Sequence, residues 1–444
     1  MKKSILLLAA LVAPSIVVAQ EPRPVSLQEA VDLARRNAPG MISARGQLRT
    51  SAMALRVAKW AAFNPLNNLN FSYSSSIGGG GRYNSEGVYQ QVNPSSWGFQ
   101  NSFGGAQFTL WDGGRKFADI SRQRAAVEQA ESNEVQQRYQ IAANVKQQYY
   151  SILSAIESRA AALSQIAQAE QQLKAAIARL RAGTAVISDS LTATVTLGSA
   201  RLALLTAENN AANASAQLTR LTGSDFPVTA IVSDTTDPPA LPMTNAELMA
   251  LAEQGPTVRT SMAQVASQHA TEKSTRAQYI WPAISMNGSY SRSNSEPTRG
   301  GFTGYDFGAG KMNYSWGFGI SASFPLWNGY VREQNMLTAS INTDNAEANL
   351  REAKLTARQN ITQQVNSLRT AEAQLVIARG NFVAAQEALR VQTQRYEIGA
   401  GALLDVLNAQ NQLNSTRSSL ITQRFTLRNT RAAIETLIGR ELPQ

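Results

Sequence analysis

Hydrophobic residues recur every seven positions over long stretches of the chain. In the second half of the sequence they are Ile361, Leu368, Leu375, Phe382, Leu389 and Tyr396, followed after a turn by Val406, Leu413, Leu420, Leu427 and Ile434. The first half has a weaker form, interrupted at Arg159 and Ala211, with Val145, Ile152, Ile166, Leu173, Leu180, Leu197, Leu204 and Leu218. A sustained seven-residue repeat predicts neighbouring helices in a left-handed supercoil. The helix predicted from about 115 to 181 is about 100 Å long, so it must lie along partner helices.

Four shorter segments alternate apolar with small polar residues instead. They span about 66–76, 97–110, 282–293 and 315–326. The second of them changes phase near Gly104-Gly105, as a β-bulge would allow. One apolar and one small polar face over about ten residues is typical of a transmembrane β-strand, although an ordinary half-buried hairpin has the same pattern. The Gly-, Ser- and Asn-rich stretches 77–96 and 294–313 predict long extracellular loops.

These patterns occur twice because the chain is a tandem duplication. Phe108-Thr-Leu-Trp-Asp-Gly-Gly recurs as Phe324-Pro-Leu-Trp-Asn-Gly-Tyr, a shift of 216 residues (324 − 108). The same shift relates Gly183 and Asp189 to Gly399 and Asp405, and Leu221-Thr-Gly223 to Leu437-Ile-Gly439. A period this long indicates a duplicated half-protein rather than a solenoid.

The duplication predicts the following domain organisation. Residues 1–19 are a signal peptide, 20–223 the first repeat, 224–244 a linker, 245–439 the second repeat and 440–444 a tail. Each repeat has the order helix, strand, loop, strand, long helix, turn, helix. The fold class is therefore a mixed α/β membrane protein with four transmembrane strands in each chain and a long helical coiled coil.

The N-terminus predicts export. Lys2 and Lys3 precede the apolar stretch Ile5 to Val12, and Val17-Val18-Ala19 is a small-residue cleavage site. A short membrane anchor is the alternative, but the apolar run is short and is broken at Pro14. No later segment approaches 18 uninterrupted apolar residues, so no transmembrane helix is predicted in the rest of the chain.

Composition and charge exclude several classes of function. The chain has no cysteine, which excludes disulfides, thiolate metal sites and a cysteine nucleophile. Its net charge of +10 is dispersed, without a basic cluster interleaved with aromatic residues, so nucleic-acid binding has no support. The single histidine, His269, has no second metal ligand nearby, and the glycine run from Gly78 to Gly81 lacks the lysine of a phosphate loop. We therefore predict no catalytic, cofactor or metal site and no enzymatic activity.

The number of strands constrains the assembly. Four strands cannot close a barrel, and an open sheet edge in lipid leaves backbone groups unpaired at a cost of several kcal/mol each. Several chains must therefore share one barrel, although this argument does not give their number.

The chain resembles the TolC family of outer-membrane efflux and secretion channels over nearly its whole mature length. The resemblance is carried by Ser-Leu-Gln-Glu-Ala-Val-Asp-Leu-Ala (26–34), by the strand-to-helix turns 110–115 and 326–330, and by 395–410, Arg-Tyr-Glu-Ile-Gly-Ala-Gly-Ala-Leu-Leu-Asp-Val-Leu-Asn-Ala-Gln. It implies a homotrimer in the outer membrane, with twelve strands continuing into a helical barrel across the periplasm. The linker around 225–242 would lie in an equatorial belt. The implied partners are a periplasmic adaptor and an inner-membrane pump of the RND or ABC type, whose substrates the channel conducts passively.

The resemblance also places a constriction at the turns between the long helices. Gly183 and Gly399 lie there and suit a left-handed helix end. Asp405 matches a family aspartate that rings the aperture, and Tyr396 matches an aromatic that helps to hold the coils closed. Asn408 stands where some members have a second aspartate.

Gly401 stands where some members have an arginine that bridges to the first-half aspartate, which is Asp189 in this chain. Three carboxylates in a narrow mouth would attract cations and raise one another's pKa. Asp189 and Asp405 can equally be N-caps of the helices that follow. Tyr396 fills a seven-residue position, so simple packing is an alternative role for it.

Two other functions compete with a channel. An exported coiled-coil structural protein or adhesin would account for the seven-residue repeats but not for the alternating strands. An exported hydrolase would need a polar catalytic cluster, which the sequence lacks. The cargo stays open, because in such systems the pump and the adaptor select it.

Overall fold

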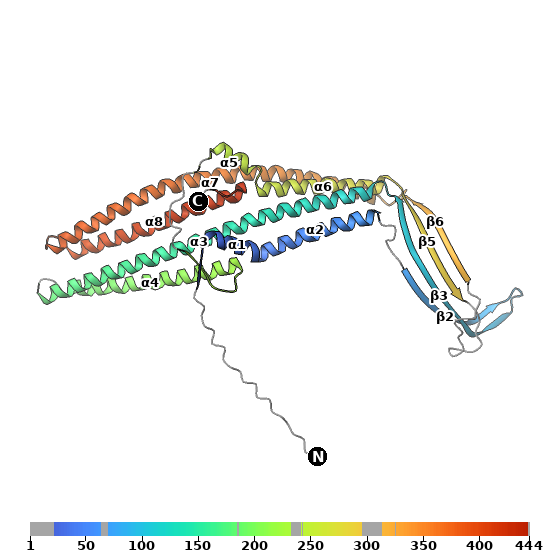
Figure 1. Cartoon of the computed structure of the whole chain (residues 1–444), viewed down its shortest axis with the longest axis horizontal. Coiled ribbons are helices and arrows are strands. Elements are labelled where there is room, and N and C mark those ends of the chain that lie inside the picture. The colour runs from blue at the N-terminus through green and yellow to red at the C-terminus, as the bar shows by residue number, and fades with distance from the viewer. Residues whose placement is uncertain are drawn as a thin grey trace, which may run out of the picture. The chain divides into compact units, whose positions relative to one another are not determined.

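The computed structural model describes residues 22–63, 70–183, 186–231, 241, 243–294, 313–324 and 326–442. The predicted signal peptide and residues 232–240 and 242 of the predicted linker lie outside these residues. The elements of the first half are β1 (Arg23–Val25), α1 (Leu27–Asn37), α2 (Pro39–Phe63), β2 (Asn70–Tyr83), β3 (Tyr89–Trp111), α3 (Arg115–Arg181) and α4 (Ile187–Thr222). Those of the second half are β4 (Val228–Ala230), α5 (Asn245–Ala252), α6 (Pro256–Ile280), β5 (Ala283–Asn294), β6 (Asn313–Ser323), α7 (Val331–Glu397) and α8 (Leu403–Ile438) (Figure 1).

The two halves match element by element. Helices α2 and α6 both have 25 residues, α3 and α7 both have 67, and α4 and α8 both have 36. The helix ends match as well, because Gly223 and Gly439 end α4 and α8 in the left-handed conformation with φ of 60° and 64°. The tandem duplication is thereby confirmed.

The chain divides into two compact units. The first contains the described residues of 1–43, 136–255 and 357–444, and the second those of 44–135 and 256–356. No helix within the described residues has the length and hydrophobicity that crossing a membrane requires.

The first unit is built on a layer of four helix segments in the order α4, α3, α8, α7 (Figure 1). Arg159 on α3 pairs with Glu208 on α4, with Nε and Oε1 3.4 Å apart. Across the next seam, Arg424 on α8 pairs with Glu157 on α3 at 3.0 Å. At the last seam the guanidinium of Arg417 on α8 lies 5.6 Å from the centre of the Phe382 ring on α7.

The seven-residue pattern marks the buried seams of this layer. Ile361, Leu368, Leu375, Val406, Leu413, Leu427 and Ile434 are all buried. The first half has, in addition, two buried alanine series with the same spacing, which the search for large apolar residues missed: Ala155, Ala162, Ala169 and Ala176 on α3, and Ala193, Ala200, Ala207 and Ala214 on α4. These alanines explain why the repeat in the first half looks weak, since a small side chain still fills a seam where two helices approach closely.

Smaller elements pack on the helix layer. Strands β1 and β4 pair in parallel, and the Tyr149 hydroxyl on α3 donates to the Val25 carbonyl at 3.2 Å. Tyr149 is fully buried in a cluster with Val25, Val31 of α1 and Val228 of β4. Helix α5 adds Leu248 to a second cluster, with Ile361, Leu368 and Ile434.

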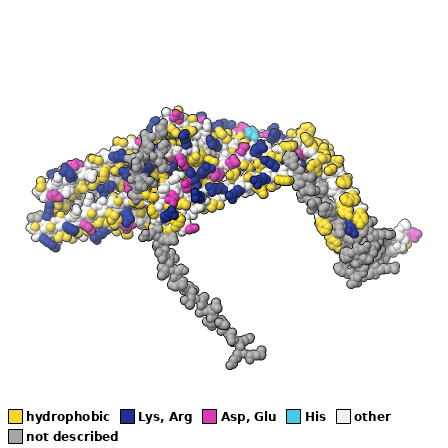
Figure 2. Space-filling model, in the orientation of Figure 1, with side chains coloured by type: hydrophobic (Ala, Val, Ile, Leu, Met, Phe, Trp, Pro, Cys, Tyr) yellow, Lys and Arg dark blue, Asp and Glu magenta, His cyan; other side chains and the backbone are white. Residues whose placement is uncertain are grey.

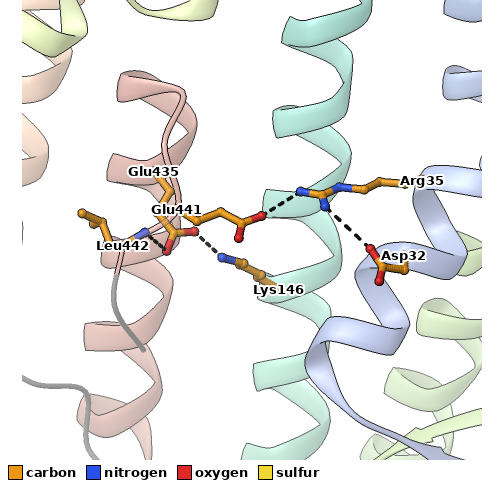
Figure 3. A network of polar contacts seen from close by, with 6 residues as sticks. All are labelled: Asp32, Arg35, Lys146, Glu435, Glu441 and Leu442. Carbon is orange, nitrogen blue, oxygen red and sulfur yellow. Dashed lines mark hydrogen bonds and ion pairs between the residues drawn. The ribbon is translucent and has the colours of Figure 1, made fainter.

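A polar network fixes the C-terminal segment to the same layer (Figure 3). The buried ammonium of Lys146 pairs with Oε2 of Glu435, and Oε1 of Glu435 accepts the Leu442 amide at 3.1 Å. Arg35 of α1 pairs with Glu441 at 2.8 Å and with Asp32 at 3.6 Å. Glu435 therefore joins α3, α8 and the C-terminal segment.

The second unit contains an antiparallel sheet in the order β2-β3-β5-β6. The register of β3 against β5 shifts between Gly104 and Ala106, which confirms the predicted phase change. Because of this shift, Phe103 stands opposite Tyr290 and Phe108 stands opposite Met286. Tyr290 and Met286 are four residues apart and therefore lie on the same face of β5.

The observed strands differ from the predicted ones at their ends. Strands β2 and β3 stay paired as far as Tyr83 and Tyr89, so the predicted loop at 77–96 is wrong over most of its length. Only the turn at 84–88 remains, where Oδ1 of Asn84 accepts the amides of Glu86 and Val88. Strand pairing uses backbone groups, which is why glycines and serines do not prevent it. The second predicted loop, 294–313, lies outside the described residues except for its two ends.

The hairpin β5–β6 has one apolar and one polar face. Tyr290 pairs with Trp316, with ring centres 4.6 Å apart, and Met286 stands opposite Ile320. At alternate positions the hydroxyls of Ser285 and Ser321 are 3.0 Å apart. The apolar face is open, because Trp316, Phe318 and Ile320 are 72%, 83% and 72% exposed.

We predict that Lys146→Ala destabilises the first unit by about 3 kcal/mol, because it removes the ammonium that contacts the buried Glu435 carboxylate and leaves only Arg431 near it. Thermal unfolding followed by circular dichroism measures the loss. Arg390→Ala, which removes the exposed Glu387–Arg390 pair on α7, is the control and should leave the stability nearly unchanged because solvent screens the pair. Equal effects of the two substitutions would contradict a structural role for the buried pair.

Candidate functional site

Both turns between the long helices close on a left-handed glycine. Gly183 follows α3 with φ of 71°, and Gly399 follows α7 with φ of 76°. Space around both is open, so the backbone conformation rather than packing favours glycine. Gly401 is different, since a Cβ there would approach the Cβ of Arg395 to 3.3 Å without any positive φ.

The two aspartates lie in the first turn of the second helices, but they are not N-caps. The N-caps of α4 and α8 are Val186 and Ala402, which carry no side-chain acceptor. The prediction that Asp189 and Asp405 occupy the cap position is therefore wrong by three residues. Oδ2 of Asp405 accepts the Ala402 amide at 3.4 Å from inside the helix. A carboxylate in the first turn still stabilises the helix through its dipole.

The Asp405 carboxylate and the Asn408 amide are both exposed on the first two turns of α8. Asp189 is half-buried on the first turn of α4. These side chains are thus available at the ends of the two helical hairpins. Nothing in their surroundings assigns them a catalytic role.

Tyr396 holds the two hairpins together through Arg179, a residue that the sequence analysis missed. The Arg179 guanidinium on the last turns of α3 lies 3.9 Å from the centre of the Tyr396 ring on α7. Its Nη2 also donates to the carbonyl of Tyr396 at 3.1 Å and to that of Glu397 at 3.5 Å. Arg179 therefore binds both a ring face and two of the last carbonyls of α7. The only signal in the sequence was a cation close to a helix end, which does not reveal that the neighbouring helix is its partner.

Three hydrogen-bonded glutamines join α3 to α8 farther from the turns. Gln410 on α8 is 2% exposed and donates to Oε1 of Gln168 on α3 at 3.2 Å. Gln172 donates to Oε1 of Gln410 in turn. These bonds fix the spacing of α3 and α8.

The sheet of the second unit carries aromatic residues at two levels. Phe71, Phe103, Tyr290 and Trp316 stand at one level of the register, one residue on each strand. The other level lies at the strand-to-helix turns, where Trp111 contacts Trp281 and Trp327 contacts Tyr330 edge to face. Phe103 and Trp111 are eight positions apart on β3, so the two levels are about 26 Å apart along the strand. An exposed apolar band of about 25 Å between aromatic girdles is the surface of an outer-membrane protein. Figure 2 shows hydrophobic side chains gathered over this part of the second unit.

Among the described residues, Tyr330 is the residue with a side chain that adopts a positive φ. Its φ is 67°, whereas the matching residue of the first half is Gly114 with φ of 84°. A left-handed conformation costs a residue with a side chain about 1–2 kcal/mol. Tyr330 keeps it with its ring 5.1 Å from that of Trp327 and largely exposed.

Other polar groups of the second unit form local contacts. Nε2 of His269 on α6 lies 3.2 Å from Oε1 of Glu347 on α7, and both side chains are about half exposed. Within the described ranges, no group of three or more His, Asp or Glu side chains could hold a metal ion.

A family model described as outer membrane efflux protein matches residues 30–224 and again residues 248–440. The chain belongs to this family. The two matches fall on the two duplicated halves. Members of the outer membrane efflux protein family are channel proteins, and this chain is accordingly an outer-membrane efflux channel that extends into the periplasm. The alternative of an exported coiled-coil protein or adhesin without a pore is not supported.

Individual relatives agree with the family. The outer membrane protein TolC of Escherichia coli K12 is 23% identical over 396 residues, which are 85% of this chain and 77% of TolC. The structure of a membrane protein from Pseudomonas aeruginosa has a TM-score of 0.76 at 20% identity, covering 93% of this chain and 90% of that one. The Campylobacter jejuni outer membrane channel CmeC has a TM-score of 0.73 at 18% identity, covering 94% and 86%. These structures confirm the predicted fold class.

We expect Arg179→Ala to loosen the hairpin ends, because it removes both the contact with the ring and the hydrogen bonds to the carbonyls. The measured quantity is single-channel conductance in planar bilayers, which should rise. Arg181→Ala, two residues further along α3 and exposed, is the control. A double variant with Tyr396→Ala should conduct no better than the stronger single variant. Additive increases would show that the two residues act independently.

Proposed function

We propose that this chain is the outer-membrane exit duct of a tripartite efflux or type I secretion system. Three copies form a twelve-stranded barrel that continues into a helical barrel. Substrates reach it from an inner-membrane pump of the RND or ABC type through a periplasmic adaptor, and the duct conducts them passively. The observation that carries this proposal is that both units end in edges that a second copy can cover.

The first pair of edges belongs to the sheet. Within the described chain, β2 and β6 each pair on one side only, with β3 and β5. In lipid, every unpaired backbone group costs several kcal/mol. Pairing β6 of one copy with β2 of the next removes both edges and closes the sheet.

The second pair of edges belongs to the helix layer. Helix α4 carries an exposed apolar row at the spacing of a coiled-coil seam: Ile187, Leu191, Val195, Leu202 and Leu205. These residues are 61–69% exposed, and they lie on the side of α4 opposite to its buried alanines. At the other edge of the layer, α7 exposes Val376, Val383 and Ile398. Because the two rows differ and lie on opposite edges, copies join head to tail, and such contacts make a ring if the rotation closes.

The membrane surface supports the same assembly. The open apolar face of β5–β6 faces lipid, while the serine hydroxyls of its other face line water. The aromatic levels described above mark the two boundaries of the bilayer. We also propose the domain boundaries predicted from the sequence, with repeats at 20–223 and 245–439 and a linker at 224–244.

Assembly is tested by placing charge in the exposed α4 row. We predict that Leu191→Glu combined with Val195→Glu prevents the ring from closing, because carboxylates would be buried against α7 of the next copy. Size-exclusion chromatography with light scattering in detergent should give a three-chain mass for the native protein and a single-chain mass for the variant. Ala203→Glu adds a charge to an exposed position on another side of the same helix, in a groove with α3 and α8, and should leave the mass unchanged. A native protein of one chain would refute the shared barrel.

Conduction is tested at the aspartates. Three Asp405 carboxylates at a narrow mouth favour cations. Asp405→Ala should therefore lower the preference for K⁺ over Cl⁻ in planar bilayers, and Asn408→Ala should not. If the Asp405→Ala channel keeps the cation preference of the native channel, the proposed duct stands. Asp405 then only stabilises its helix.

A further inference from the structure

The helix layer of the first unit has two unlike faces. On α3 the covered face presents Lys146 and Tyr149, which contact Glu435, the C-terminal segment and the β1–β4 pair. On α8 the same face presents Glu435. Buried charge gathers there, since Lys146, Arg428, Arg431 and Glu435 are all buried. Burial lowers the pKa of Arg431, while the nearby Glu435 carboxylate opposes the shift.

On each helix, a residue two positions from one on the covered face points the opposite way, because two residues rotate by about 200° around the helix axis. These residues form the opposite face of the layer. On α3 it carries one residue every seven positions, namely Asn144, Ser151, Ser158 and Gln165. Beside these lie Gln140, Gln147 and Ser154. On α8 the face carries Thr426, Thr430 and Ala433. It has amides, hydroxyls and alanines, and no element of the first unit covers it among the described residues.

Grooves on this bare face have the same composition. One of ≈ 840 Å³ between α7 and α8 is lined by Gln363, Asn366, Thr370, Gln374, Thr426 and Thr430. Another of ≈ 570 Å³ joins α3, α8 and α7 through Gln140, Asn144, Gln147, Gln364 and Asn429. A third of ≈ 430 Å³ between α3 and α4 has Ser151, Ser154, Ser158, Asn210, Asn213 and Gln217.

Charged residues at the margins of the grooves are already engaged. Arg358 borders the first groove and pairs with Glu253 beside α5 at 2.5 Å. A fourth groove, between α3, α4 and α8, includes Arg417, whose guanidinium lies over the Phe382 ring. The grooves therefore present neutral groups to whatever enters them.

We propose that this bare face is the inner wall of the helical duct and that its side chains are uncharged. Hydrated solutes and amphiphiles of either charge sign can therefore pass along it. The inference rests on the proposed function. In a ring joined through α4 and α7, one face of the layer must turn inward, and the other face already carries α1, α5, the strand pair and the C-terminal segment. Turning that face inward would fill the tube.

A neutral wall has a definite chemical effect on the cargo. A fixed charge would retain counter-charged solutes and repel those of like charge. An amide or hydroxyl exchanges one hydrogen bond with water for another, so the net attraction stays small. Charge selection is then confined to groups outside this wall, such as Asp405 at the helix turns.

The chain has no native cysteine, so single cysteines report the two faces directly. Ser151→Cys places a thiol on the bare face of α3, and Ala160→Cys places one on the same helix two heptads after Lys146, on the covered side. Both positions are exposed. Each variant is labelled in the assembled channel with a cationic, an anionic or a neutral methanethiosulfonate, and labelling is checked by mass spectrometry.

We expect the reversal potential of the Ser151→Cys channel in a KCl gradient to shift toward that of Cl⁻ with the cationic label and toward that of K⁺ with the anionic one. The neutral label should leave it unchanged, and the labelled Ala160→Cys channel should behave as the native one. Shifts at Ala160 instead, or fully labelled Ser151 without any shift, would overturn the proposal. If neither the native protein nor the unlabelled Ser151→Cys protein forms a channel although both assemble, the proposed duct itself is refuted. That outcome is distinct from a failure of the proposal about its wall.

Discussion

A helix of 67 residues buries little of its own surface, so α3 and α7 depend on helices packed along them. Every other feature of the first unit follows from that requirement. The seams are filled by one residue in seven, large in the second half and largely alanine in the first. Because alanine is small, α3 and α4 can approach closely. At the next seam, the pair between Arg424 of α8 and Glu157 of α3 helps to keep these two helices in register. The remaining side chains of each helix are left free for other tasks.

Those tasks are divided between the two faces of the layer. Charges that are expensive to bury are concentrated where α1, α5 and the C-terminal segment supply partners, as Glu435 does for Lys146 and for the Leu442 amide. The other face keeps neutral amides and hydroxyls, which need no partner besides water. The segregation of charge therefore allows one thin layer of helices to be a stable scaffold on one side and a wet surface on the other.

The turns at the ends of the hairpins solve a different problem. Two helices must reverse direction there while neighbouring hairpins stay together. Gly183 and Gly399 provide the left-handed backbone, and Arg179 supplies a cation that binds the ring of Tyr396 and the carbonyls of Tyr396 and Glu397. Gly401 stands where, by the resemblance, some family members have a bridging arginine. Arg179 offers a contact between hairpins from the first half of the chain instead.

The sequence by itself determined the types of element, their order, the duplication and the phase change at Gly104-Gly105, because periodicity is a local property written into each segment. It also placed the glycines of both turns. Only the tertiary structure decided that Arg179 binds Tyr396, since that choice depends on which helix end lies beside α3. It likewise moved Asp189 and Asp405 from the cap to the third helical position, because backbone hydrogen bonds rather than side-chain preference set where α4 and α8 begin. The extension of β2 and β3 through a glycine-rich stretch has the same cause: strand pairing joins backbone groups, and side-chain patterns do not report it.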